Sequence, residues 1–593
     1  MAHIGKVDYR LTACGFLGAV TMGVAPFTIA TIAAHRSTPY TPSLASNEIQ
    51  EDSTTLLRRL KVTQRDLERI RRRSLPFATG SYGGRCDEQI GRFCYWYDDE
   101  DDWTPSPDNK RVVRQRETFL ASLDSASRKI PADPWVAAQR VRYLVEADRM
   151  DHALQATANC KEADWWCATL TGYVLHYSGD FAAADSAFRS ALSLMPEQQR
   201  CEWNDLSLLL EGSARGRYKD LACGEREDFE RRFWWLADPF YGIPGNERRS
   251  EHFYRLVLNA VLEESASPRR LRWGNDNREL LVRFGGPIGW EQRRVRGAMS
   301  VSDASIFAYH RNGGRQFVPP PEIFEDPTTL AAGEWKIDPE RARSRFAIPG
   351  FAHYAPIEYQ VAAFKRGDSA ALVLSGGWVA PLEDAALHGE IAIALAPNEN
   401  TRPTVAIGRY GTPLQLQVNR EPTLVSVELW NSHDSIAGRD RGWIDLNERL
   451  PKEFGISDIL LLEESDSLPE TLEQAIPHTR SNLEALPGER LGLFWEVYGG
   501  PAGPGLMQFT LTVNRLQKSF FRKAAEWAGI AGRRVDTVRL RWNESVAANR
   551  GMSSFAVGIQ LQDSMSGEYA LTLTVSRPDG VEAHSERRLV VPH

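Results

Sequence analysis

The sequence predicts a multidomain protein with α-helices in its front half and antiparallel β-sheets in its rear half. Three observations lead to this prediction. At 593 residues the chain exceeds the roughly 250–300 residues at which a single core stops growing. Residues 131–196 repeat a helical pattern, and beyond residue 350 apolar and polar residues alternate with a period of two.

The composition is that of an ordinary globular protein. Hydrophobic residues make up 42% of the chain and charged residues 25%. The net charge of −7 and the isoelectric point near 6.0 give no basic footprint of the kind that nucleic-acid-binding domains carry. We therefore expect no nucleic-acid partner.

An uncharged stretch of 24 residues, Leu11–Ala34, follows the basic residues Lys6 and Arg10. A bilayer-spanning helix needs about 20 apolar residues. A secretory signal has a shorter apolar core and ends at small residues, for which Thr31–Ala34 is an acceptable cleavage site. Both interpretations stay open, and we assign residues 1–36 to a signal peptide or an N-terminal transmembrane anchor that brings the chain to a membrane.

Six of the seven cysteines fall into three close sequential pairs: Cys86 with Cys94, Cys160 with Cys167, and Cys201 with Cys223. Paired cysteines in even number are typical of an oxidising compartment. We therefore predict three disulfides between sequence neighbours and an exported protein. Six cysteines allow about fifteen connectivities, and buried free thiols in a cytosolic protein are the alternative. Zinc is not expected, because neither CxxC nor HxxxH spacing occurs.

Residues 37–130 are assigned to a polar linker (37–53), a basic amphipathic helix and an aromatic segment between Cys86 and Cys94. Apolar residues at 56, 60, 67 and 70 predict the helix, and Pro76 stops it. Its basic residues between Arg58 and Arg73 predict a solvated face or attraction to anionic lipid headgroups. The positive-inside rule would keep them in the cytoplasm, against the cysteine argument. The acidic run 98–102 lacks the order of a calcium loop and is predicted as a solvated loop.

Residues 131–232 are predicted as stacked helical repeats. Small and aromatic residues recur at the spacing of a packed helix pair: Gly172, Gly179-Asp180-Phe181, Ala184, Phe188, Ala191 and Pro196. This pattern resembles a tetratricopeptide repeat, in which small residues let two antiparallel helices approach closely. Asp148–Met150 and Ala153 repeat it 31 residues upstream, and we expect a degenerate third unit from Cys201 to Leu236. Stacks of about three such units present a concave surface to a peptide or protein.

Residues 233–350 carry a second resemblance. The residues concerned are Trp234, Asp238-Pro239, Asn246-Glu247, Glu251, Arg255, Trp273, Asp276, Arg278 and Arg283–Pro287. They resemble the GWxTD-domain proteins of bacteria, which combine this region with upstream helical repeats and downstream β domains. Arg272 and Asn275 depart from that signature, so a close backbone approach at this turn is not expected. The resemblance implies a mixed α+β domain in a bacterial protein and brings no activity with it.

The candidate site consists of Glu247, Glu251, Arg255, Trp273, Asp276 and Arg278. Asn246 suits a helix N-cap, with Glu247 in the first turn. Glu251 and Arg255 lie at i,i+4 on one helix and should pair. A turn from Trp273 is expected to enter a strand at Glu279–Phe284. Two interpretations stay open: a polar pocket that faces a ligand, or an ion-pair network that fastens the helix to the strand.

The rear half is predicted as two antiparallel β-sandwich units, residues 351–450 and 451–593, with a loop-rich stretch near 450–487. Alternation is clear at Leu414–Val418 and Val425–Leu429, and later strands are expected at 509–513, 538–542, 555–561 and 569–575. The last two strands resemble those of immunoglobulin-like domains, although the Cys…Trp…Cys core of that family is absent.

The sequence contains no HExxH, Walker A or GxSxG motif. We therefore predict no catalytic residue, metal or cofactor, although a Ser-His-Asp set assembled from distant positions stays open. His252, His310 and His353 lie in or near the central segment and are expected to be hydrogen-bonded structural residues. Most tryptophans lie in apolar runs and are expected in the core.

Two functional hypotheses follow. The first is an exported or membrane-anchored interaction scaffold of the bacterial envelope, which binds a peptide or protein through its helical repeats without catalysis. The alternative is an envelope hydrolase that uses Glu247, Glu251 or Asp276. That hypothesis requires a carboxyl group in a cleft with a pKa raised by burial.

Overall fold

A computed structural model describes residues 44–78, 86–97, 103–293, 305–311, 313–379, 389–465, 467–500, 505–516, 537–546 and 551–592. The chain divides into two units, Met1–Asp52 and Ser53–His593, and the contacts discussed below lie within the second. Within the described residues the fold is helical first and β-stranded afterwards, as the sequence predicts. None of the described helices is both long and apolar enough to cross a bilayer. The predicted anchor or signal segment, Leu11–Ala34, lies outside the described residues.

The basic helix α1 (Leu44–Arg73) packs against the repeats. Glu68 accepts a hydrogen bond from Tyr143 at 2.7 Å, and Arg71 pairs with Glu146 at 2.7 Å. Arg72 donates to the backbone carbonyl oxygens of residues 268 and 269. Two predictions are therefore corrected. The linker 37–53 ends early because α1 begins at Leu44, and part of the basic face is used in packing, whereas Arg58, Arg59, Arg65, Arg69 and Arg73 are exposed.

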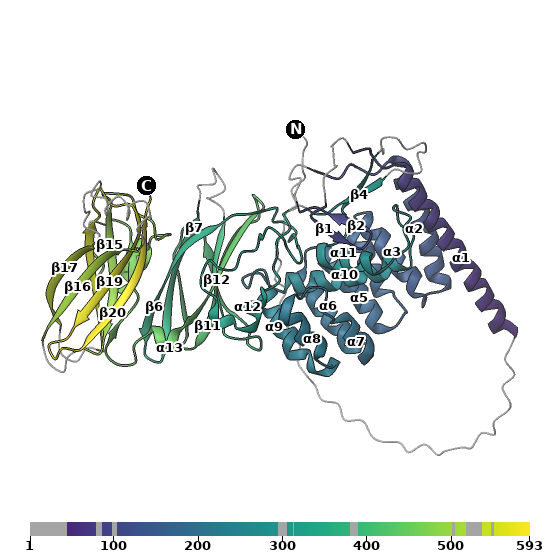
Figure 1. Ribbon diagram of the computed structural model, residues 1–593. Helices are drawn as coiled ribbons and strands as arrows, with labels where there is room; N and C mark the ends of the chain where they lie inside the picture. The colour runs from purple at the N-terminus through teal and green to yellow at the C-terminus, as the bar shows by residue number, and fades with distance from the viewer. Residues whose placement is uncertain are drawn as a thin grey trace, which may run out of the picture. The chain divides into compact units, whose positions relative to one another are not determined.

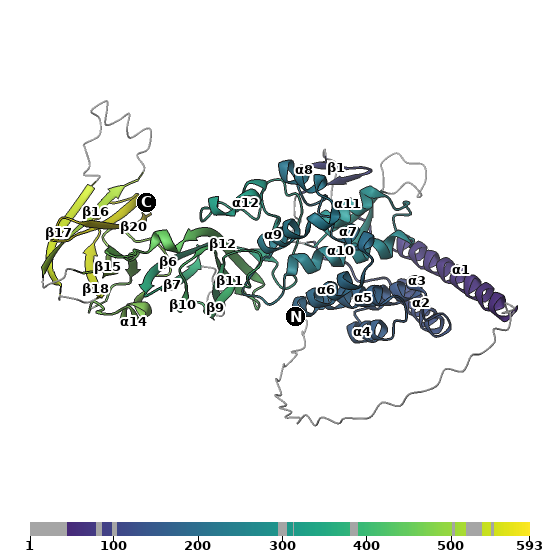
Figure 2. The ribbon, with the colours of Figure 1, turned by 90° about the horizontal axis from the view of Figure 1, so that it is seen from below.

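Two helix pairs follow the helix α2 (Lys110–Lys129). They are α3 (Pro134–Glu146) with α4 (Met150–Ala158), and α5 (Asp164–Tyr177) with α6 (Phe181–Leu194). The turn of each pair contains a residue in the left-handed region, Asp148 at φ 58° and Gly179 at φ 83°, which are 31 residues apart. Ala153 and Ala184, also 31 residues apart, are fully buried. The predicted register is therefore that of two equivalent helix pairs, whose helices lie side by side in Figure 2.

Three short helices follow in the region of the expected third unit: α7 (Glu197–Trp203), α8 (Gly212–Asp220) and α9 (Glu227–Ala237). Next come α10 (Glu247–Glu263) and α11 (Asn275–Phe284). Asn246 caps α10 by accepting from the Arg249 backbone N–H at 2.7 Å, as predicted. The predicted strand at Glu279–Phe284 is wrong, because these residues belong to α11. Leu280, Leu281 and Phe284 are buried at helical spacing, and Gly285, at φ 85°, ends the helix.

Two small hairpins accompany these helices: β1 (Glu88–Ile90) with β2 (Phe93–Tyr95), and β3 (Gly289–Arg293) with β4 (Ser305–Tyr309). The Cys86–Cys94 disulfide closes the first hairpin. The guanidinium of Arg283 in α11 donates two hydrogen bonds, of 2.5 and 2.9 Å, to the carboxylate of Glu88 in β1. This partly buried ion pair holds the first hairpin against α11.

The three predicted disulfides are all present: Cys86–Cys94, Cys160–Cys167 and Cys201–Cys223. Their Cα atoms lie 5.2, 5.7 and 5.8 Å apart, within the range that a bridge requires. The second joins the end of one helix pair to the start of the next. Disulfides are a feature of exported proteins, so the predicted extracellular or periplasmic location is supported.

The rear strands form two double layers, green to yellow in Figure 1. Residues 351–450 contribute one sheet of β6 (Ile357–Arg366), β7 (Ser369–Trp378) and β10 (Leu414–Asn419). The facing sheet contains β5 (His353–Tyr354), β8 (Glu390–Ala396), β9 (Thr404–Arg409), β11 (Pro422–Asn431) and β12 (Ile436–Asp445). Leu372 and Leu374 of the first share a core with Ile393 and Val427 of the second. All strand pairs here are antiparallel except β5–β12, which is parallel.

The last unit has the same two-layer design. One sheet consists of β13 (Gly455–Ile456), β14 (Leu460–Leu462), β15 (Arg490–Tyr498) and β18 (Met552–Gln560). The other consists of β16 (Gly505–Arg515), β17 (Thr537–Val546), β19 (Gly567–Ser576) and β20 (Glu582–Val591). Trp495 is buried between the layers, as expected of a core tryptophan. The described residues of the stretch 450–487 lie mostly in loops, as predicted, and the short strands β13 and β14 are set among them.

Backbone contacts link the helical part to the first double layer. The carboxylate of Glu428 accepts from the backbone N–H groups of Tyr241 and Gly242, both at 2.9 Å. Arg441 donates to the carbonyl oxygens of Leu236 and Asp238 at 2.8 and 2.7 Å. Both side chains are almost fully buried. The end of α9 and the loop after it are therefore held to β11 and β12, because Glu428 and Arg441 form hydrogen bonds with their backbone N–H and C=O groups.

Replacing Gly172 by valine should destabilise the helical repeats by about 1–3 kcal/mol, because a bulkier side chain overpacks the helix pair. A Cβ atom on Gly172 would lie 2.7 Å from the Phe188 ring. Urea unfolding measures the change. The matched control is Gly216→Ala in α8, where a Cβ atom meets nothing within 4 Å; it should leave stability unchanged or raise it. Equal losses in both variants would contradict the packing argument.

Non-reducing peptide mapping of the full chain should find the three neighbouring bridges and no free thiol among the six cysteines. Reduction should cost about 2–3 kcal/mol for each of the two short loops and about 3 kcal/mol for the longer loop, from loop-closure entropy. Their sequence separations are 8, 7 and 22 residues. Quantitative thiol labelling without reductant would contradict the assignment.

Candidate functional site

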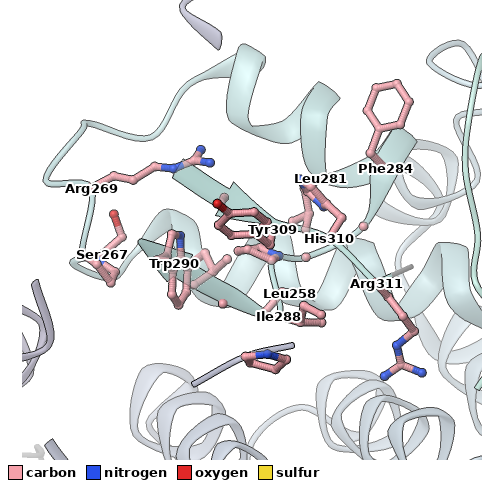
Figure 3. Close-up of a pocket in the computed structure, with 18 of the residues that line it drawn as sticks. Leu258, Ser267, Arg269, Leu281, Phe284, Ile288, Trp290, Tyr309, His310 and Arg311 are labelled. Carbon is pink, nitrogen blue, oxygen red and sulfur yellow. The ribbon is translucent and has the colours of Figure 1, made fainter. Parts of the chain in front are cut away.

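A cavity of about 970 Å³ lies between the repeat helices and the two hairpins. Its walls come from the end of α1, the β1–β2 hairpin, residues 103–109, helices α2, α3, α5, α10 and α11, and the β3–β4 hairpin. Figure 3 shows Trp290, Tyr309 and His310 of the β3–β4 region among the lining residues, together with Leu258 and Leu281 of the helices. The volume is at the upper end of the range for ligand pockets, about 300–1,000 Å³.

Aromatic side chains build much of the wall and are fixed in pairs. Trp103 stacks on Tyr309 with ring centres 3.9 Å apart, and Tyr95 stacks on Phe284 at 3.8 Å. One carboxylate, Glu291, accepts from Trp103 Nε1 at 3.2 Å and from the Tyr309 hydroxyl at 2.9 Å. Rigid aromatic surfaces of this kind lose little conformational entropy when they contact a ligand.

Polar residues from two helices meet at the inner end of the cavity. His176 of α5 donates from Nε2 to Glu251 of α10 at 2.6 Å, and its Nδ1 lies 2.9 Å from the Ser250 hydroxyl. Glu251 also accepts from Arg255 Nε at 2.5 Å, the predicted i,i+4 pair. The same guanidinium donates to the carbonyl oxygens of Val282, Arg283 and Arg345 at 2.7–3.0 Å. This cluster ties α5, α10, the end of α11 and residue 345 together.

A serine, a histidine and a glutamate in contact invite comparison with a catalytic triad. In a triad the serine oxygen must reach the substrate. Ser250 is fully buried, does not line the cavity, and its hydroxyl donates to the Glu247 carbonyl at 3.1 Å. The set therefore holds His176 in place and offers no nucleophile to the cavity.

The electrostatics of the site also oppose acid–base chemistry. Burial raises the pKa of Glu251, but the Arg255 charge and the His176 hydrogen bond outweigh it and lower the pKa to about 2. Glu146 behaves alike beside Arg71 and Arg142, with a pKa of about 2. The third lining carboxylate, Asp108, is paired with Arg116 at 2.6 Å. The hydrolase hypothesis requires an accessible carboxyl of raised pKa, and neither Glu251 nor Glu146 supplies one.

The structure brings only half of the candidate site residues to the cavity: Glu251, Arg255 and Trp273. Trp273 donates from Nε1 to Asn259 at 3.0 Å. Asp276 does not line the cavity. Its two carboxylate oxygens accept hydrogen bonds from Arg92 Nε at 2.6 Å and Arg92 Nη2 at 2.7 Å. These hydrogen bonds lower the pKa of Asp276 to about 2. Arg278 does not line the cavity.

Glu247 belongs to a different environment. It is fully buried beside Asp238, away from the cavity. Burial, followed by the negative charge of Asp238, raises the pKa of Glu247 well above its usual range. Both oxygens of Glu247 lack a hydrogen-bond donor among the described residues. A neutral, inaccessible acid fits a structural role at the start of α10.

The histidines differ from one another. His252 is fully buried, its ring nitrogens have no hydrogen-bond partner among the described residues, and burial lowers its pKa well below the usual value. It therefore departs from the expected hydrogen-bonded role. His310 lines the cavity, and burial lowers its pKa to about 4. His353 is exposed on β5.

Sequence reasoning missed most of the cavity wall, notably Arg269, Trp290, Tyr309 and Arg311. The short apolar run Ile306–Tyr309 was the available signal for a strand. No group of three or more histidine, cysteine or acidic side chains able to hold a metal occurs within the described residues. The acidic run 98–102 lies outside them.

No family model matches the chain, and no curated protein matches its sequence. Among solved structures it is similar to a sporulation control protein from Bacillus subtilis (13% identity, TM-score 0.15), covering 24% of this chain and 51% of that one. The match to red sea bream transglutaminase has 11% identity and a TM-score of 0.14, and it covers 40% of this chain and 31% of that one. The match to Bacteroides uniformis β-glucuronidase has 10% identity and a TM-score of 0.15, and it covers 38% of this chain and 26% of that one. The chain thus spans less than two thirds of each, and these scores support neither a shared fold nor a shared function.

The pKa of Glu251 predicts how stability should depend on pH. A folded-state pKa of about 2, below the ordinary 4.5, gives stability that is present above pH 4.5 and is lost as pH falls towards 2. Glu251→Gln leaves Arg255 buried without its partner, so it should cost about 3–5 kcal/mol at pH 7. The difference between wild type and variant in urea unfolding should shrink between pH 4.5 and 2.

The exposed carboxylate of Glu264, which pairs with Lys61 at 3.2 Å, provides the control. Glu264→Gln should change stability by no more than about 1 kcal/mol at any pH. A difference for Glu251→Gln that stays constant down to pH 2 would contradict the ion-pair account.

Proposed function

We propose that this chain is an exported binding protein of the bacterial envelope, which holds a peptide or protein segment in the cavity beside its helical repeats. The single observation that carries the proposal is a cavity of about 970 Å³ whose three carboxylates are all paired with arginines. Such a site can recognise a ligand but has no free acid, base or nucleophile among these groups. Binding is therefore the function that we infer for this cavity.

The repeats take part in this function directly. Helix α5 contributes Tyr173, His176 and Tyr177 to the cavity wall. In a tetratricopeptide-like stack, such helices line the surface that meets the partner. The three disulfides support work outside the cytosol.

The family and the location belong to the same proposal. We assign residues 233–350 to a GWxTD-like domain on the residues quoted above, and the rear double layers to immunoglobulin-like spacers. An N-terminal anchor or cleaved signal in residues 1–36 would place the cavity on the outer side of a membrane.

Selection from a displayed library of random hexapeptides tests the proposal. The full chain should retain a defined set of peptides. Ala308→Trp, which puts a large side chain on β4 into the cavity, should weaken their binding at least tenfold. Ala121→Trp on the exposed face of α2 is the matched control and should change nothing. Peptides retained equally by all three proteins, or by none, would contradict the proposed function.

A further inference from the structure

The cavity has an excess of positive charge. Eight arginines and three carboxylates line it, counted over the described residues. Each carboxylate is already engaged: Asp108 by Arg116, Glu146 by two arginines, and Glu251 by Arg255. Positive side chains therefore remain after every lining acid has been matched. A ligand that carries negative charge complements this balance.

Two of the remaining arginines are Arg269 and Arg311. The Arg269 guanidinium lies 4.8 Å from the centre of the Phe93 ring, and its Nε is buried without a partner. Burial alone lowers the pKa of Arg269 to about 10, since no carboxylate offsets it. Arg311 is exposed and has no carboxylate partner in the described part of the chain. Figure 3 shows the two arginines on opposite sides of Tyr309 and His310.

The backbone between these arginines is an open strand edge. β4 pairs only with β3 among the described strands, while residues 306–311 line the cavity. The Tyr309 carbonyl accepts from the Ile288 N–H at 2.8 Å and so points towards the β3 side. Because backbone groups alternate along a strand, those of Ile306 and Ala308 point to the other edge. An added peptide strand is the ligand that satisfies such an edge.

We propose that the cavity binds an extended acidic peptide, which adds a strand to β4 and sets its carboxylates against Arg269 and Arg311. This inference rests on the proposed function and names the class of its ligand. From Ile306 to Arg311 a strand covers roughly 17 Å at about 3.3 Å per residue, so about five peptide residues fit. Residues one and five of such a peptide point to the same face, and the side chains of residues two and four point to the opposite face, towards the aromatic wall.

An apolar anion such as a fatty acid is the competing ligand. It would match the aromatic wall and one arginine. It offers no N–H or C=O groups to β4 and has a charge at one end only. The open edge and the two separated arginines therefore favour the peptide.

The test uses the full chain and the pentapeptide acetyl-Glu-Phe-Thr-Phe-Glu-amide, measured by calorimetry. The glutamine analogue should bind at least tenfold more weakly, and the lysine analogue more weakly still. A glutamine analogue with a free terminal carboxylate distinguishes a chain terminus from acidic side chains as the source of charge. N-methylation of alternate peptide nitrogens should abolish binding, because it removes the donors that pair with β4. Oleate should not displace the peptide.

Matched variants locate the charges. The double variant Arg269→Gln, Arg311→Gln should bind the acidic peptide at least tenfold more weakly. Its affinity for the glutamine analogue should be unchanged. Arg490→Gln, at an exposed position in β15, should change neither. Equal binding of the glutamate and glutamine peptides to wild type would overturn the inference while leaving the proposed function intact. Full binding of the N-methylated peptide, or displacement by oleate, would overturn the strand pairing or the choice of a peptide. Failure of every peptide, in this assay and in the library selection, would remove the proposed function itself.

Discussion

The buried guanidinium of Arg255 is the interaction on which the site depends. Its exposed fraction is 2%, and an arginine so deeply buried is tolerable only if its charge and its donors are matched. Glu251 supplies the charge, and three backbone carbonyls from two separate segments supply the acceptors. Because Glu251 also holds His176, the same cluster joins α5, α10, α11 and residue 345. The inner end of the cavity is thereby rigid.

Pairing the acidic side chains with arginines also affects the chemistry that these acids can perform. A carboxylate held beside arginines has a low pKa and makes a poor general acid or base. Glu146 and Glu251 follow this rule, and Asp276 does so outside the cavity. Arg269 and Arg311 remain without a carboxylate among the described residues, so the arginines that pair with these acids do not use up the positive charge of the cavity. The ion pairs that hold the helices together therefore also determine the charge that the cavity presents to a ligand.

Sequence reasoning succeeded where the determining contacts are local. The 31-residue offset places Asp148 and Gly179 in equivalent turns, and i,i+4 spacing pairs Glu251 with Arg255. Neighbouring cysteines form the three bridges. Reasoning failed where partners are distant: Arg92 lies 184 residues from Asp276, and hairpins far apart in sequence close the cavity. Spacing carries no information about such contacts. The missed helix α11 shows that a short apolar run fits either period.

Amide hydrogen exchange of the full chain with the acidic pentapeptide tests the central claim, that a rigid, positively charged cavity binds an extended segment at β4. The amides of Ile306 and Ala308 should exchange more slowly when the peptide is bound, since a new strand would accept from them. Those of α10 should be slow in both states, because the Arg255 cluster is already formed. Protection confined to surfaces away from the cavity, or fast exchange throughout α10, would contradict the account.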